Sequence, residues 1–129
     1  MATYLQENVS SFFDSYPKEF MLGICRVMEF EEYQQDDILM WKGEKGDKMY
    51  ISLGGRLGIY LGNTPGILAR DPIAILNPFA VVGDKALKYE GDVRSATVKC
   101  LDEGSTTCLT LTKEHYQKLF MKQAIYNKI

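Results

Sequence analysis

The sequence predicts an α+β fold in which an antiparallel β-roll, a jelly-roll-like barrel, is flanked by helices at both ends of the chain. Apolar residues recur at three- and four-residue spacing near both termini, which is the period of an α-helix. Between these segments lie short apolar runs separated by glycine, asparagine and proline, which are typical of many strands joined by turns. No internal repeat or low-complexity tract interrupts this order.

The N-terminal segment, residues 1–28, is predicted to be helical. Its apolar residues follow the helical period from Val9 to Val27, and the sequence Ser15-Tyr16-Pro17 interrupts them. Proline is favoured in the first turn of a helix. We therefore expect two short helices, the second of which begins near Pro17.

Residues 29–111 are predicted to form the β-roll. Six segments have the composition of strands, namely 37–41, 48–53, 56–61, 73–76, 94–101 and 105–111. Several acidic residues near the start of this region are interpreted as solvated strand edges and turns, not as paired catalytic acids: Glu29, Glu31, Glu32, Asp36 and Asp37.

Residues 112–129 are predicted to close the chain with a helix. Thr112 provides a hydroxyl N-cap, and Glu114 places a negative charge in the first turn. Tyr116, Leu119 and Phe120 then share one face. A chain of 129 residues can bury one core and is too short for two, so we expect one domain over residues 1–129.

The composition argues against two classes of partner. The chain has 15 basic and 17 acidic residues and a formal charge of −2, so it has no basic field that would bind a nucleic acid. Its apolar runs are far shorter than the roughly 20 residues that span a bilayer. We therefore expect neither nucleic acid binding nor membrane insertion.

The three cysteines, Cys25, Cys100 and Cys108, are odd in number and lack a CxxC spacing. This pattern argues against a zinc site and against a disulfide framework. Cys100 and Cys108 either lie on neighbouring strands, close enough to pair, or are buried free thiols, and we favour the second reading. Reduced thiols indicate a cytoplasmic protein.

The residues do not support an enzyme. His115 is the sole histidine and lies in the predicted closing helix, so a metal site of several histidines cannot be built. The sequence has no GxSxG motif to present a nucleophile. We expect no catalytic residue, no metal and no cofactor.

Two segments point to the binding of a phosphate. Gly83-Asp84-Lys85-Ala86-Leu87 pairs a glycine turn, which a ligand can approach closely, with the later segment Val93-Arg94-Ser95-Ala96-Thr97. Strand alternation from Arg94 would place it on the face of Ala96 and Val98. Because an unpaired buried charge is costly, Arg94 needs an anion. That anion is either a phosphate or one of two carboxylates, Asp84 or Asp92, unless Arg94 is simply exposed at the start of the strand.

These segments resemble the phosphate-binding cassette of the cyclic nucleotide-binding domain family, which reads Phe-Gly-Glu-x-Ala-Leu, a loop, then Arg-(Ala/Ser/Thr)-Ala. Residues 43–60 are similar to a second signature of the family, in which a Gly-Asp turn leads into a strand, a glycine and another strand. The resemblance extends over roughly residues 5–125. It implies a β-roll with N-terminal helices, a short cassette helix and a C-terminal helix.

The resemblance also implies a ligand, cAMP or cGMP, and a role for each cassette residue. Arg94 and the amides of Ala86 and Ser95 would surround the phosphate, while Gly83 and Asp84 would hold the ribose. The Ser95 hydroxyl either favours cyclic GMP or faces solvent. Among the residues of the closing helix, Tyr126 is the candidate base cap, with helix packing as the alternative.

Three departures from the family pattern lead to a second hypothesis. Asp84 stands where the family usually has glutamate, Phe79 and Ala80 replace a glycine and an acidic residue, and Val82 replaces the phenylalanine before Gly83. The first hypothesis is a regulatory sensor that relays binding to an effector domain or subunit, such as a kinase, a channel or an exchange factor. The second is a ligand-free fold that acts as an interaction or structural module.

Overall fold

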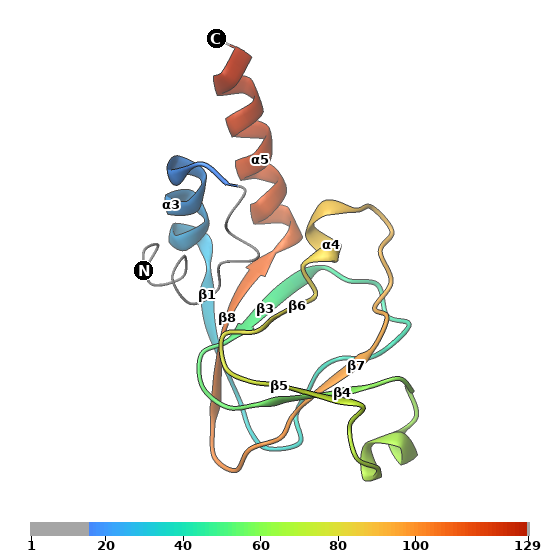
Figure 1. Ribbon diagram of the computed structural model, residues 1–129. Coiled ribbons are helices and arrows are strands. Elements are labelled where there is room, and N and C mark those ends of the chain that lie inside the picture. Colours follow the sequence, from blue (N-terminus) through green and yellow to red (C-terminus); the bar gives the residue numbers. More distant parts are fainter. Residues whose placement is uncertain (1–15, 129) are drawn as a thin grey trace.

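The computed structural model of the chain describes residues 16–128. Two four-stranded antiparallel sheets form a roll, with helices at one end of it (Figure 1). The strands are β1 (Glu29–Tyr33), β2 (Ile38–Met40), β3 (Lys48–Ser52), β4 (Leu57–Tyr60), β5 (Ala74–Leu76), β6 (Val81–Val82), β7 (Thr97–Cys100) and β8 (Thr106–Thr112). The helices are α3 (Lys18–Val27), α4 (Lys85–Lys88) and α5 (Lys113–Lys128), and a 3-10 turn spans Pro65–Ala69.

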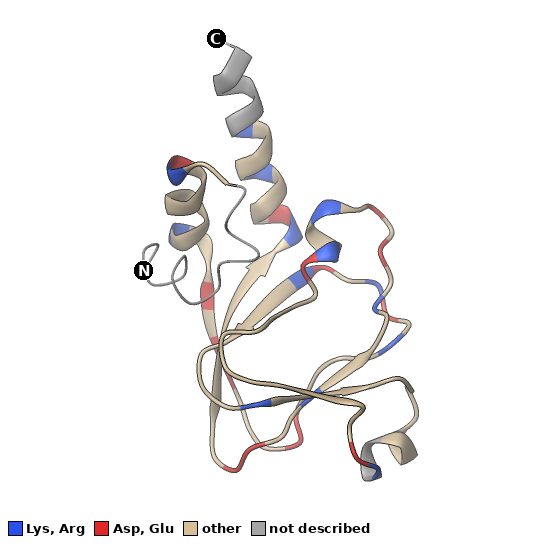
Figure 2. Cartoon of the chain, viewed as in Figure 1, with Lys and Arg blue, Asp and Glu red and all other residues tan. Residues whose placement is uncertain are grey.

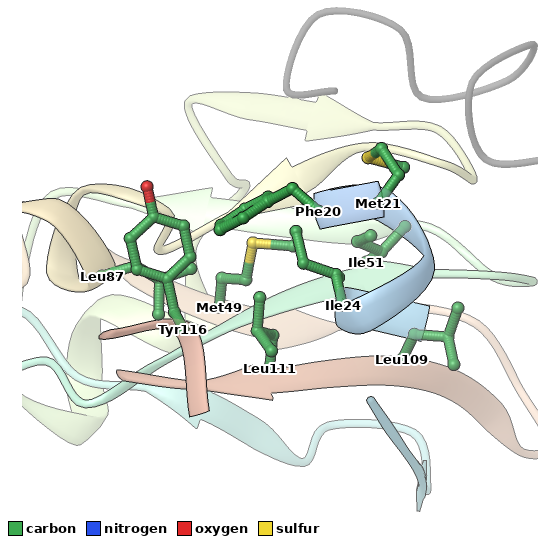
Figure 3. Close-up of a cluster of buried hydrophobic side chains, with 9 residues drawn as sticks. All are labelled: Phe20, Met21, Ile24, Met49, Ile51, Leu87, Leu109, Leu111 and Tyr116. Carbon is green, nitrogen blue, oxygen red and sulfur yellow. The ribbon is translucent and has the colours of Figure 1, made fainter. Parts of the chain in front are cut away.

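The strand order is β1-β8-β3-β6 in one sheet and β2-β7-β4-β5 in the other. Side chains alternate across β3, so Met49 and Ile51 face the helices while Tyr50 faces the second sheet. The roll therefore has two cores, one between the sheets and one beneath the helices. Figure 3 shows the second, in which side chains from α3, β3, α4, β8 and α5 meet.

The helices confirm the prediction for the parts of the chain that the structure describes. α3 begins directly after Pro17 and buries Phe20, Met21 and Ile24 against the first sheet. α5 begins at Lys113, where the Thr112 hydroxyl accepts a hydrogen bond from the amide of His115 at 3.2 Å. The earlier helix expected between Val9 and Ser15 lies outside the described residues.

The sheets differ from the prediction at three strands. β1 was not among the predicted strands because its sequence, EFEEY, has too few apolar residues, and pairing with β8 forms it instead. β6 has only two residues. β7 begins at Thr97, three residues after the predicted start at Arg94. The reason is that residues 92–94 form backbone hydrogen bonds with the turn at residues 43–46. The alternation predicted from Arg94 is therefore wrong, and Thr97 is buried.

The prediction that the acidic residues of β1 are solvated is wrong for one of them. Glu29 and Glu32 are exposed, but Glu31 is half-buried and accepts a hydrogen bond from Lys48 Nζ at 2.9 Å. Lys48 lies on β3, so this ion pair spans the intervening strand β8. The predicted solvated turn holds for Asp36 and Asp37, which are exposed.

The cysteines are free, as favoured above. Cys100 lies on β7 and Cys108 on β8, in different sheets, and both are buried in the core between them. Burial raises the pKa of Cys100 to about 11 and that of Cys108 to about 12. Both thiols therefore remain protonated at neutral pH.

Candidate functional site

A cavity of about 320 Å³ opens where β6 leads into α4, opposite the segment that precedes β7. Figure 1 shows α4 and the loop that joins it to β7 on the same side of the roll. The cavity lining includes Gly83 and the polar or charged residues Asp84, Lys85, Asp92, Arg94 and Ser95. Met40, Ile59, Val82 and Val98 are among the apolar residues of the lining. The lining of the cavity therefore combines charged and apolar groups.

Arg94 is the buried cation of this cavity, with 7% of its surface exposed. Its Nη2 donates to the carbonyl oxygen of Lys48 at 2.6 Å, and its Nη1 donates to that of Gly83 at 3.2 Å. Among the described residues, no carboxylate forms an ion pair with it. Arg94 is thus neither exposed nor paired with Asp84 or Asp92. Two neutral carbonyls hold a cation whose charge remains available to an anion.

Two glycines leave the space that the guanidinium occupies. Gly83 has φ +80°, and a Cβ atom there would lie 2.5 Å from Arg94 Nη1. A Cβ atom on Gly46 would lie 2.6 Å from the Cβ of Ala86 and 3.0 Å from Arg94 Cζ. Side chains at either position would therefore displace Arg94 or the helix beside it. Sequence reasoning missed this role of Gly46, whose only signal was the Gly-Asp turn of the second signature.

The turn that contains Gly46 also fixes the backbone of Arg94. The amide of Arg94 donates to Glu44 O at 2.8 Å, and the amide of Gly43 donates to Arg94 O at 2.8 Å. The amide of Gly46 donates to Asp92 O at 3.0 Å. The turn thus pairs with the residues around Arg94 as a short antiparallel ladder, which is why β7 begins later than predicted.

The cassette helix α4 follows the glycine turn. Ala86 is fully buried, does not line the cavity, and its amide donates to Gly83 O at 3.3 Å. Asp84 occupies the N-cap position, where its half-buried side chain makes no capping hydrogen bond. Asp84 lines the cavity, and the helix does not use its carboxylate as a cap.

The structure brings four of the predicted site residues, Gly83, Asp84, Arg94 and Ser95, to one cavity. Ala86 lies behind its wall, against Gly46. Ser95 is exposed at the cavity. Tyr126 belongs to α5, but its side chain lies outside the described residues.

Phe79 stands where the resemblance predicts glycine, and its backbone adopts φ +73°. This left-handed conformation costs a non-glycine residue about 1–2 kcal/mol. The Phe79 side chain is half-buried against the core beneath the helices, and its amide donates to Ser52 O at 2.6 Å. The turn before the cassette thus keeps the shape that suits glycine, and the packing of the ring offsets the strain.

Within residues 16–128, no group of three or more His, Cys, Asp or Glu side chains is arranged to hold a metal ion. The same part of the chain contains no helix long and apolar enough to cross a membrane.

Comparison with solved structures finds the same fold. The regulatory subunit of a cAMP-independent protein kinase A from Trypanosoma brucei, solved as a mutant bound to cAMP in its A site, is 26% identical with a TM-score of 0.74. The match covers 97% of this chain and 42% of that one. The N-terminal domain of a transcriptional regulator from Streptomyces coelicolor is 20% identical, with a TM-score of 0.69, over 90% of this chain and 77% of that one.

Comparison of sequences finds a family and more distant relatives. A cGMP-dependent protein kinase of Drosophila melanogaster is 25% identical over 120 residues, which cover 88% of this chain and 13% of the kinase. The chain therefore spans a small part of the curated relatives that it matches. The sequence model of the cyclic nucleotide-binding domain matches residues 30–123. With this match and the roll, cassette and buried arginine described above, the chain belongs to the cyclic nucleotide-binding domain family.

Proposed function

We propose that this domain is a sensor that binds cAMP or cGMP in the cavity beside α4 and relays binding to an effector. The observation that carries the proposal is Arg94, a buried guanidinium that lines a cavity and has no carboxylate partner among the described residues. A cyclic phosphodiester supplies the single negative charge that such a group needs.

The mixed lining of the cavity, with charged and apolar residues, suits the two parts of a nucleotide. The phosphate would lie against Arg94 and the amide of Ser95, and the amide of Ala86 would join them after a small shift of α4, because it now donates to Gly83 O. Asp84 would accept a hydrogen bond from the ribose hydroxyl, beside Gly83. The base would pack on apolar residues such as Met40 and Ile59, and Tyr126 of α5 is the proposed cap.

The relay would use the contact between α4 and α5. Leu87 of α4 and Tyr116 of α5 belong to the same buried cluster, so a shift of α4 would displace the closing helix α5. The Tyr116 hydroxyl lies 2.8 Å from that of Tyr16, the residue that precedes Pro17 and α3. Binding can move these helices only by the difference in ligand affinity between their two arrangements. The effector would be a kinase, a channel or an exchange factor, and the free thiols suit the reducing cytoplasm.

The alternative function, a ligand-free interaction module, is favoured by one observation. Three large apolar side chains are exposed on or beside the edge strand β5, namely Leu61 at 56%, Ile73 at 62% and Ile75 at 50%. Such side chains suit contact with another protein surface. A sensor that docks on its effector would also use them, so this observation alone does not exclude binding of a nucleotide.

Titration calorimetry with cyclic AMP and cyclic GMP tests the proposal. We expect saturable binding to the unaltered domain, and a loss of about 100-fold or more in Arg94→Ala, because a charged contact is removed from a desolvated site. Arg94→Lys should recover only part of the affinity, because a lysine cannot reproduce the fork of the guanidinium.

Arg56→Ala is the matched control, since Arg56 is exposed and paired with Asp102 away from the cavity. Thermal unfolding of each variant verifies that it is folded. If the folded, unaltered domain gives no heat with either nucleotide up to millimolar concentration, the sensor hypothesis fails and the interaction module is favoured.

A further inference from the structure

The cavity gathers four charged residues, Asp84, Lys85, Asp92 and Arg94. None of them forms an ion pair with another residue in the described part of the chain. The five ion pairs of the same part of the chain all lie elsewhere. Figure 2 shows basic residues on α4, and acidic residues in the turn before it and in the loop after it. Charged side chains that line a cavity and form no ion pair within the protein are available to a ligand.

Lys85 is the second cation of this group. It is the first residue of α4, it is exposed, and it follows the Gly83-Asp84 turn whose carbonyl binds Arg94. The acidic residue that follows α4, Glu90, is already bonded to Lys113 at 3.2 Å and to Gln117 at 3.0 Å. Lys85 is also among the residues that line the cavity, and the flexible stem of a lysine allows its ammonium to reach an anion there.

We propose that Lys85 is a second anion-binding residue of this site, which holds the ligand phosphate from the mouth of the cavity while Arg94 holds it from within. This inference rests on the proposed function, because it assigns a further residue to the same ligand. Arg94 is fixed by two carbonyls and a ladder of backbone bonds, so it sets the position of the anion. Lys85 is exposed and adds charge, so it acts on affinity in a salt-dependent way.

The test is calorimetric titration of the chain with cAMP, cGMP and the uncharged nucleosides adenosine and guanosine, at low and at high salt. At low salt, Lys85→Met should raise the Kd of both cyclic nucleotides about two- to fivefold, as expected for an exposed charge pair. This difference should shrink at high salt, and the affinity for either nucleoside should not change. Lys85→Arg should bind as the unaltered domain does, because it restores the charge.

Lys88→Met is the matched control. It removes a positive charge from the same helix, but Lys88 lines the groove between α4 and α5 instead of the cavity. Equal affinities of Lys85→Met and the unaltered domain for cyclic nucleotides, with binding lost only in Arg94→Ala, would overturn this inference alone. So would an equal loss for nucleosides and cyclic nucleotides. Absence of binding to the unaltered domain would overturn the proposed function together with it.

Discussion

At the scale of single residues, the site depends on the absence of a side chain at two glycines as much as on the side chain of Arg94. Arg94 can lie buried only because Gly46 and Gly83 bring no side chain into its space. Its guanidinium is bound by carbonyls, which orient it and leave its charge uncompensated. An arginine oriented in this way is prepared for an anion before the anion arrives, so little of the binding energy is spent on ordering it.

Gly46 is therefore expected to affect both stability and binding. In Gly46→Ala the new methyl group would meet Ala86 at 2.6 Å, and overpacking of this kind costs about 1–3 kcal/mol of unfolding free energy. Because the same methyl group presses on Arg94, affinity for a cyclic nucleotide should also fall. Urea unfolding and calorimetry measure the two effects.

Gly54→Ala is the control for this prediction, since a Cβ atom at Gly54 would meet nothing within 4 Å. It should unfold and bind almost as the unaltered domain does. Equal stability of Gly46→Ala and Gly54→Ala would show that α4 and Arg94 adapt without cost, contrary to the packing argument.

At the scale of elements, the polar strand β1 is held by its partners. Its apolar content is too low to predict a strand, yet five of its residues pair with β8. Glu31 adds a bond to Lys48 of β3 and another to the neighbouring Tyr33 hydroxyl. Burial alone raises the pKa of Glu31, but hydrogen bonds from Tyr33 and Lys48 outweigh it, so the pKa lies below its ordinary value of 4.5.

A lowered pKa in the folded state means that this carboxylate stabilises the fold above its unfolded pKa and ceases to do so as pH falls through its folded pKa. The unfolding free energy should therefore fall as the solution is acidified below about pH 4. Glu31→Gln should lessen this fall, since it removes the titrating group. Urea unfolding over a pH series measures it.

Glu32→Gln provides the comparison on the same strand, because Glu32 is exposed. Its acid dependence should follow that of the unaltered domain. If Glu31→Gln and Glu32→Gln behave alike, the ion pair across β8 contributes nothing to acid stability.

At the scale of the whole molecule, helices from opposite ends of the chain meet at one end of the roll. Tyr16 stacks on Phe20 of α3 with ring centroids 4.8 Å apart, and its hydroxyl meets that of Tyr116 on α5. Burial, followed by the hydrogen bond to Tyr116, raises the pKa of Tyr16, so the Tyr16 hydroxyl stays protonated at neutral pH. Tyr116 and Leu87 of α4 belong to the same buried cluster, so the tyrosine pair links α4, which lies beside the cavity, to α3 and α5.

We expect Tyr116→Phe to loosen α3 from α5 while the sheets keep their stability. Loss of one hydrogen bond should lower the local opening free energy of α3 by about 0.5–1.5 kcal/mol. Hydrogen exchange of the α3 amides measures this change against the amides of β3 and β8. Tyr50→Phe is the control, because its hydroxyl bonds to Leu39 O within the roll. Unchanged exchange in α3 would contradict the role of the tyrosine pair.

The sequence by itself determined the order of the helices and most strands, and it located the glycine turn and the arginine of the cassette. Apolar period, N-caps and turn residues are local, so each can be read within a few neighbouring positions. The roles of the predicted site residues in binding stay predictions.

The tertiary structure alone decided that β1 pairs with β8, that Arg94 lies outside β7, and that Gly46 leaves space for the Arg94 guanidinium. It also decided that Phe79 keeps a left-handed backbone without glycine. These features arise where segments far apart in the sequence approach each other, as the turn at Gly43 to Gly46 does with the residues around Arg94. The conformational preference of a short segment is weak compared with the hydrogen bonds and packing between such segments. Only the folded chain therefore shows which of these long-range contacts form.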